Sequence, residues 1–159
     1  MTNNYTIRFA YEADASGITN LILSTSLACC FGSAMPCPDW YEESVNADQI
    51  LRLIQSKEMT WMLAVYENKV AGVLAIQAGT HVKYFFVKPE HHRQGIGKSL
   101  WAFALKAIAL GESLSVRSSL FAVPAYKCLG FINTGTQQEF KGMHFQAMSA
   151  QLSVLRCRL

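Results

Sequence analysis

The stretch His92-Arg-Gln-Gly-Ile-Gly-Lys98 follows the apolar run Tyr84-Phe-Phe-Val87 and precedes a segment whose apolar residues recur at helical spacing. This order predicts a strand, a tight turn that needs both glycines, and a helix that begins at the second glycine. The first amides of a helix have no partner within it, and the positive end of the helix dipole lies beside them. The turn is therefore expected to bind an anion, above all a phosphate group, with Arg93 and Lys98 adding two positive charges.

The composition is typical of one folded domain that covers residues 1–159, since 51% of the chain is hydrophobic and 16% is charged. The formal charge of +3 is small, so it calls for neither nucleic acid nor an anionic membrane as a partner. The longest apolar helical stretch, residues 100–110, is much shorter than the roughly 20 residues that cross a bilayer. Residues 1–5 lack the basic start and apolar core of a secretory signal.

The chain has five cysteines, an odd number, and no pair of them has the two-residue gap typical of zinc ligands. We therefore expect reduced thiols, no bound metal and a cytoplasmic location. The cysteines are Cys29, Cys30, Cys37, Cys128 and Cys157.

Apolar spacing and turn residues predict the element order β-α-α-β-β-β-α-β-α-β-β. The connection between the strand at 82–87 and the strand at 114–116 is long enough for a parallel crossover, and the other neighbours are expected to be antiparallel. The sequence thus predicts an α/β (α+β) fold with a mixed, mostly antiparallel sheet of about seven strands flanked by helices. The other expected strands are 5–10, 61–66, 70–76, 131–136 and 143–148, and the expected helices are 14–27 (capped by Asp14), 40–56, 97–110 and 120–129.

Two common phosphate-binding motifs fit the glycine turn poorly. Gly97-Lys-Ser99 matches the end of a nucleotide triphosphate loop, but that loop needs a glycine where His92 stands. A dinucleotide-binding turn needs a third glycine after Gly95-Ile-Gly97 and an acidic residue on the next strand, where the chain has Ser113 and Ser115.

A family resemblance fits better. The segment Val87 to Leu100 resembles the acetyl-coenzyme A signature of the Gcn5-related N-acetyltransferases (GNAT), whose core is Q/R-x-x-G-x-G/A. Val116 to Phe131 resembles the second signature of that family, in which a serine (Ser119) and an alanine precede a tyrosine (Tyr126) and a Leu-Gly-Phe ending. The two segments have the order and the separation that the family shows, and the predicted element order extends the resemblance over nearly the whole chain.

The resemblance implies a binding site for coenzyme A. Amides of the glycine turn are expected to hold the pyrophosphate, and the backbone at the end of the strand 82–87 is expected to bind the pantetheine arm. The implied cofactor-binding residues are Phe85, Phe86, Val87, Arg93, Gln94, Gly95, Ile96, Gly97, Lys98 and Ser119.

The resemblance also implies an activity, the direct transfer of an acetyl group from acetyl-CoA to a primary amine in a ternary complex. Tyr126 matches the tyrosine that gives a proton to the departing thiolate, and a phenol with a pKa near 10 suits that role. The alternative is a non-catalytic CoA-binding or regulatory module. It is suggested by Ser115, where some relatives have a glutamate, and by Arg117, where many have an asparagine.

The sequence leaves the amine acceptor open, as a small molecule or a protein. No motif in residues 29–43, where the family builds its acceptor site, identifies it. Glu42, Glu43, His81, His144 and a water chain all remain candidates for the general base. A homodimer is also open, through a C-terminal strand that carries Leu152, Val154 and Leu155.

Overall fold

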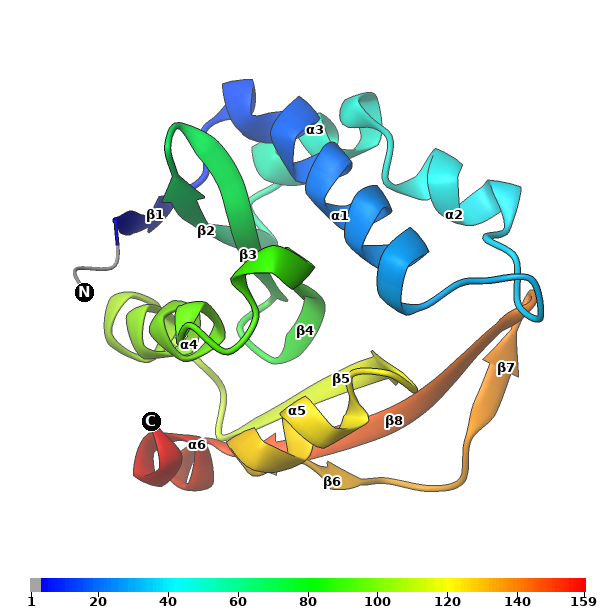
Figure 1. The fold of residues 1–159 in the computed structure, drawn as a ribbon. Coiled ribbons are helices and arrows are strands. Elements are labelled where there is room, and N and C mark those ends of the chain that lie inside the picture. The colour runs from blue at the N-terminus through cyan, green and yellow to red at the C-terminus, as the bar shows by residue number, and fades with distance from the viewer. Residues whose placement is uncertain (1–3) are drawn as a thin grey trace.

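The chain folds around one open sheet, with strand order β1-β2-β3-β4-β5-β8-β6 and β7 paired with β8 (Figure 1). The computed structural model describes residues 4–159, so the first three residues of the segment considered for a secretory signal lie outside it. The strands are β1 (Tyr5–Phe9), β2 (Met59–Tyr66), β3 (Lys69–Gln77), β4 (His81–Val87), β5 (Ser113–Ser119), β6 (Ile132–Asn133), β7 (Gln138–Phe140) and β8 (Met143–Gln151). The α-helices are α1 (Ala15–Cys29), α2 (Asp39–Ser44), α3 (Ala47–Gln55), α4 (Ile96–Ala107), α5 (Val123–Leu129) and α6 (Leu152–Arg158).

The pairing of the strands agrees with the predicted fold class. β4 and β5 form a parallel pair, joined through α4, and the other strand pairs are antiparallel. The short strand β7 was not predicted, and it brings the sheet to eight strands. The α/β fold with a mostly antiparallel mixed sheet is confirmed.

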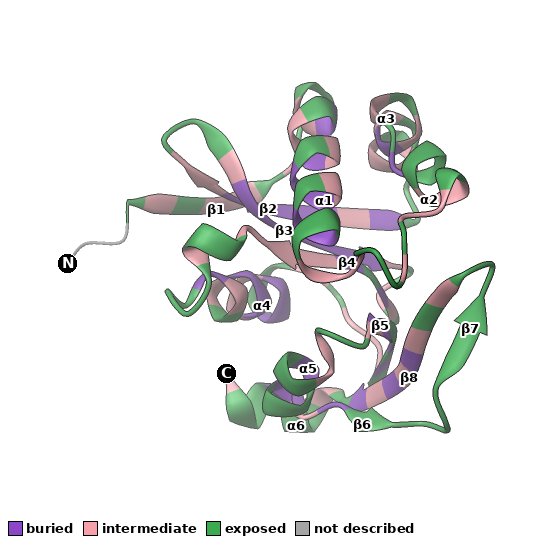
Figure 2. Ribbon diagram, turned by 45° about the vertical axis from the view of Figure 1, so that its right-hand side comes forward, coloured by how far each residue is buried: buried purple, intermediate pink, exposed green. Residues whose placement is uncertain are grey.

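The sheet has an apolar core on each face. In β2, successive residues alternate between the two cores, because side chains of a strand point to opposite faces. Met62 packs in the core that contains Leu100 and Trp101 of α4, and Leu63 packs in the core that contains Ile18 of α1. In Figure 2, buried residues accordingly fill the central strands and the inner sides of α1 and α4.

Two predicted elements are wrong in type or continuity. The helix expected at 40–56 is divided into α2 and α3, since the Asn46 side chain accepts a hydrogen bond from Gln49 N at 2.9 Å and starts a new helix. The expected C-terminal strand is the helix α6, in which Leu155 is fully buried. The strand surface suggested for a homodimer therefore does not exist.

Element ends also differ from the predictions. α4 ends at Ala107, α5 begins at Val123, and β6 contains two residues of the strand expected at 131–136. β5 reaches Ser119 because its full length pairs with β8, which apolar spacing within 114–116 does not reveal.

Asp14 lies at the start of α1, but its side chain does not cap that helix. One carboxylate oxygen accepts a hydrogen bond from Tyr11 N at 2.7 Å, and the carboxylate forms a salt bridge with Arg8 at 2.8 Å. The hydrogen bonds from Arg8 hold the pKa of Asp14 below its usual value. Asp14 thus ties β1 to the turn that leads into α1.

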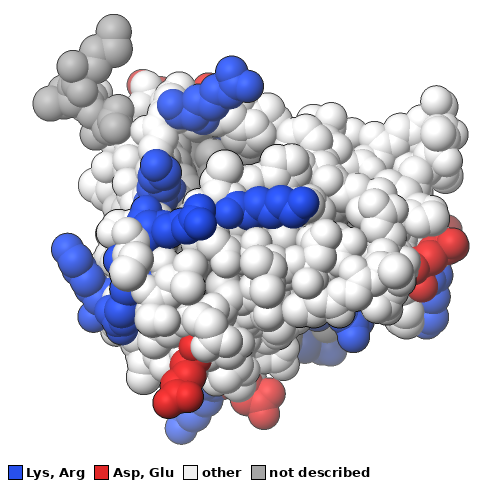
Figure 3. Space-filling view, turned by 90° about the horizontal axis from the view of Figure 1, so that it is seen from below, with Lys and Arg blue, Asp and Glu red and all other residues white. Residues whose placement is uncertain are grey.

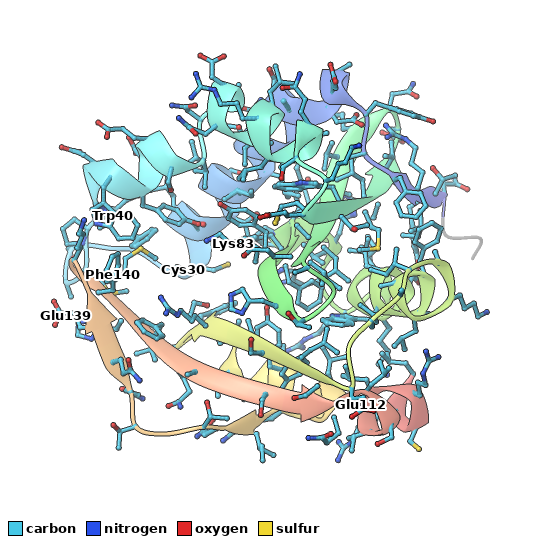
Figure 4. The ribbon with its side chains drawn as sticks, turned by 180° about the vertical axis from the view of Figure 1, so that it is seen from behind. Cys30, Trp40, Lys83, Glu112, Glu139 and Phe140 are labelled. Atoms are coloured by element: carbon cyan, nitrogen blue, oxygen red, sulfur yellow. The ribbon has the colours of Figure 1, made fainter. Side chains whose placement is uncertain are left out.

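The hairpin formed by β7 and β8 reaches across to α2. The indole Nε1 of Trp40 donates a hydrogen bond to Lys141 O at 2.8 Å, and its ring packs edge-on against Phe140, with ring centroids 5.5 Å apart. Figure 4 shows Trp40 and Phe140 together at this junction. We call this contact the hairpin–α2 bridge.

Charge is unevenly spread over the surface. On the face seen from below, Lys and Arg side chains gather in the upper left part, and much of the remaining surface is uncharged (Figure 3). Other Lys and Arg side chains lie along the lower and right edges of this face. Among the helices within residues 4–159, none combines the length and the apolar character needed to cross a membrane.

Candidate functional site

The candidate site lies where β4 and β5 separate. Their parallel pairing covers His81 with Ser115 and Val82 with Val116, although both strands continue beyond these pairs. We call the point after Val82 and Val116 the fork. Beyond the fork, the facing backbone edges of β4 and β5 have no strand between them, so their polar groups are available to a ligand.

A β-bulge shapes the β4 side of the fork. Ala75 of β3 is opposite Tyr84, and the next residue, Ile76, is opposite Val82, so Lys83 has no partner in β3. A bulge bends a strand and increases its local twist. The parallel pairing with β5 ends at Val82, next to this bulge, and Lys83 is an exposed side chain beside the fork.

A cleft of about 690 Å³ opens from the fork toward the glycine turn. It is lined by β4, β5, α5, the turn before α4 and the C-terminal end of α1. Cys30 and Lys83 lie in this space, between the part of the sheet that ends with β4 and the part that begins with β5 (Figure 4). The lining residues are Thr25, Cys29, Cys30, Lys83, Phe85, Phe86, Val87, His91, His92, Arg93, Gly95, Ile96, Gly97, Val116, Arg117, Ser118, Ser119, Phe121, Ala122, Pro124, Ala125, Tyr126 and Cys128.

The glycine turn has the expected geometry at the start of α4. Gly95 is the N-cap residue, and its φ of +83° lies in the left-handed region that glycine adopts without strain. A Cβ on Gly97 would come 3.1 Å from Cζ of Phe85, so a side chain there would disturb the ring that lines the cleft. The helix begins at Ile96, and its first amides lie at the end of the cleft away from the fork.

The cleft brings together most of the predicted cofactor-binding residues. Eight of the ten line it, and Gln94 and Lys98 do not. The Gln94 side chain donates a hydrogen bond to Glu90 O at 3.3 Å, so a role for residue 94 would fall to its backbone amide. The eight are Phe85, Phe86, Val87, Arg93, Gly95, Ile96, Gly97 and Ser119.

Tyr126 lines the same cleft from α5 and is 4% exposed. Its ring lies between Phe85 and Phe131, with centroid distances of 5.8 Å and 5.2 Å. Burial raises the pKa of Tyr126 above the ordinary value of a phenol. The hydroxyl is therefore protonated at neutral pH and can donate a hydrogen bond or a proton.

Two histidines near the cleft have hydrogen-bond roles. His92 Nε2 lies 2.6 Å from Val87 O, and since a carbonyl can only accept, this nitrogen carries the proton. His81 Nδ1 lies 2.8 Å from Ser115 Oγ, across the first pair of the parallel ladder. None of the four candidate bases, Glu42, Glu43, His81 and His144, is among the residues that line the cleft.

Several lining residues were not predicted. Cys128 lies two positions after Tyr126, about 200° around a helix, and this spacing predicts that it faces away from Tyr126, but it lines the cleft as well. One sign in the sequence distinguishes Lys83, namely a charged residue among the mostly apolar residues of its strand. The β-bulge explains why its side chain lies beside the fork. All five cysteines are free thiols, and within residues 4–159 no three His, Cys, Asp or Glu side chains form a metal-binding group.

A mixed sheet that forks between two parallel strands, with a cleft that leads from the fork to a glycine turn at a helix start, is the architecture of an acetyltransferase fold. Residues 33–152 match the model of the acetyltransferase (GNAT) domain. The chain belongs to the GNAT family. No curated protein matches it in sequence.

Solved structures of acetyltransferases have the same fold as this chain. A GCN5-related N-acetyltransferase from Rhodopseudomonas palustris superposes with a TM-score of 0.73 at 14% identity, over 95% of this chain and 98% of that one. PaiA N-acetyltransferase from Thermoplasma acidophilum, in complex with coenzyme A, gives 0.67 at 17% identity, over 95% and 99%. YncA from Salmonella typhimurium, whose structure contains its cofactor acetyl-CoA, gives 0.68 at 20% identity, over 94% and 95%.

Proposed function

We propose that the protein is an acetyl-CoA-dependent N-acetyltransferase that acetylates a primary amine by direct attack in a ternary complex. The observation that supports this most is the fork, which leaves the edges of β4 and β5 unpaired and leads to a left-handed glycine at a helix start. A cleft with free backbone groups along one wall and free helix amides at its end suits an extended molecule that carries a pyrophosphate.

In this proposal, different residues bind the two portions of coenzyme A, its pyrophosphate and its pantetheine arm. Amides of the turn at Gly95, Ile96 and Gly97, with Arg93 beside them, bind the pyrophosphate. The β4 edge from Phe85 to Val87, apart from the Val87 carbonyl that His92 already occupies, and Ser119 bind the pantetheine arm. The co-substrate acetyl-CoA supplies the acetyl thioester.

The chemical step is carried by the amine and by Tyr126. The neutral amine attacks the thioester carbonyl, so that a C–N bond forms and the C–S bond breaks. Because the four candidate bases do not line the cleft, we assign removal of the amine proton to water. Tyr126 gives its hydroxyl proton to the departing sulfur and regains one from solvent.

A thiol-release assay with acetyl-CoA and a panel of primary amines tests this proposal. An N-acetyltransferase releases free CoA in proportion to the amine, with an equal amount of acetylated product found by mass spectrometry. Binding of acetyl-CoA without release by any amine supports the alternative, a non-catalytic CoA-binding module. Absence of binding in titration calorimetry contradicts both.

Gly97→Ala is expected to weaken acetyl-CoA binding about tenfold, which corresponds to about 1.4 kcal/mol. The added methyl group meets Phe85 at 3.1 Å and narrows the approach to the turn amides. Titration calorimetry measures the change in Kd. Gly32→Ala is the matched control, because a Cβ at Gly32 meets nothing within 4 Å. Equal affinity of the two variants for acetyl-CoA would contradict the proposal that the glycine turn binds it.

A further inference from the structure

Two cations stand at the fork. Val82 and Val116 form the last pair of the parallel ladder, and Lys83 and Arg117 are the next residues on the two strands. Both side chains are exposed, and both residues line the cleft. Lys83 precedes Val87 by four residues, about 13 Å of extended strand. This basic pair is therefore separate from the glycine turn, where the pyrophosphate is expected.

No carboxylate balances the charge of Lys83 and Arg117. Asp and Glu are absent from the residues that line the cleft. The salt bridges within residues 4–159 join Arg8 to Asp14 and His91 to Glu90, so neither cation at the fork has an acidic partner. The Arg117 guanidinium instead lies over the Phe145 ring, 5.4 Å from its centroid. Two unpaired cations beside a cleft can attract an anionic group of a ligand.

Their field reaches a neighbouring ionisable group. The pKa of His81 is lowered, first by burial and then by the positive charges of Lys83 and Arg117. An ammonium group in the same place is disfavoured in the same way, whereas a neutral amine is not. The pair thus opposes polycationic acceptors and favours the unprotonated amine that attack on a thioester requires.

A buried hydroxyl in the same cleft lacks a partner. Thr25, on α1, is 5% exposed and lines the cleft, and its Oγ1 makes no hydrogen bond within residues 4–159. A buried polar atom without a partner is costly. A polar ligand in the cleft would satisfy it.

We infer that the acceptor is a small amine that also carries a carboxylate, such as an amino acid, with the carboxylate bound between Lys83 and Arg117. The inference rests on the proposed acetyltransferase function and adds the class of acceptor to it. The acceptor enters at the fork, and coenzyme A occupies the cleft toward the glycine turn. The amine then lies between the anchored carboxylate and the thioester.

The test compares matched pairs of acceptors in the thiol-release assay. Each pair is an amino acid and its decarboxylated amine, for example phenylalanine with phenethylamine and β-alanine with ethylamine, and spermidine serves as a polycation. The amino acids are expected to have kcat/KM at least about tenfold higher than their partners, because a charge-assisted hydrogen bond is lost with the carboxylate. A preference for the decarboxylated amines or for spermidine overturns the inference and leaves the acetyltransferase proposal intact.

Variants at the fork make the test specific. Lys83→Gln and Arg117→Gln are expected to lower kcat/KM about tenfold for the amino acids and less than about threefold for the decarboxylated amines. Lys106→Gln, on the exposed side of α4, removes the same charge outside the cleft and should change neither. Equal losses for both members of a pair contradict the inference.

A binding measurement tests the carboxylate site even if the protein has no transferase activity. If no amine releases CoA, titration with N-acetyl amino acids in the presence of CoA gives the second readout. Binding that Lys83→Gln weakens supports the basic pair as a carboxylate site in a protein without transferase activity. Absence of both release and binding overturns the inference.

Discussion

Replacing Tyr126 by phenylalanine is expected to lower kcat about 100-fold and to change the Kd for acetyl-CoA less than about twofold, as expected for loss of a general acid. The ring of Tyr126 is held between Phe85 and Phe131, so the phenylalanine variant keeps the packing of the cleft wall. Only the hydroxyl is removed, and with it the proton for the departing sulfur. Steady-state kinetics with a good acceptor and calorimetry with acetyl-CoA measure the two effects.

Tyr84→Phe is the matched control. Tyr84 is also a buried tyrosine, 8% exposed, whose pKa burial raises to about 12. It stacks on Trp61 in the core on the α1 side and does not line the cleft. This control should keep normal turnover. If Tyr126→Phe does so too, Tyr126 has only a packing role.

The raised pKa of Tyr126 also sets a pH dependence. The phenol is active while it carries its proton, and burial keeps it protonated to a higher pH than an ordinary phenol. Ionisation of Tyr126 should therefore cause no loss of kcat below about pH 10, the ordinary phenol pKa.

Replacing Gly130 by alanine is expected to lower the free energy of unfolding by about 3 kcal/mol, from left-handed strain together with overpacking. Gly130 ends α5 with φ of +106°, and a Cβ there would lie 2.6 Å from Cγ1 of Val154 on α6. Either the backbone turn or the docking of α6 must shift. Urea denaturation followed by circular dichroism measures the change.

Gly135→Ala separates strain from overpacking. Gly135 has a φ of +143°, but a Cβ there meets nothing within 4 Å, so we expect a loss of about 1 to 2 kcal/mol from strain alone. The double variant Gly130→Ala, Val154→Ala should recover the difference between the two single variants. Equal losses at Gly130 and Gly135 would show that the contact with α6 carries no weight.

The sequence predicted the parts of the fold that depend on local chemistry. The glycine turn and the helix after it follow from glycine spacing, and the order of helices and strands along the chain follows from apolar runs. Asn46 was also a local signal, because asparagine is a common N-cap and can start a new helix. The apolar spacing continues on both sides of Asn46, so this spacing alone predicts one helix. The resemblance of two segments to one family then predicted coenzyme A as the ligand.

The end of the cleft at the fork, where we propose that the acceptor binds, could not be predicted in this way. The bulge at Lys83 is a difference in register between two strands, and no residue within β4 marks it. Arg117 reaches the cleft because β5 extends along β8, a pairing between residues about 30 positions apart. Thr25 belongs to the site through the packing of α1 over the sheet. Each of these depends on long-range contacts that spacing along the chain does not record.

The hairpin–α2 bridge has a consequence for the rate at which ligands leave. The part of the sheet that ends with β4 and the part that begins with β5 are joined by the β4–β5 pairs at the fork. They are joined again where the Trp40 indole donates a hydrogen bond to Lys141 O. The cleft side of the molecule is therefore connected at two places, by the β4–β5 pairing and by the hairpin–α2 bridge. To widen the space between these two places, the protein must break the indole hydrogen bond or bend β8. We therefore expect a product to leave only after such an opening, and a variant that loosens Trp40 is expected to speed up the turnover of an acceptor whose release is slower than its chemistry.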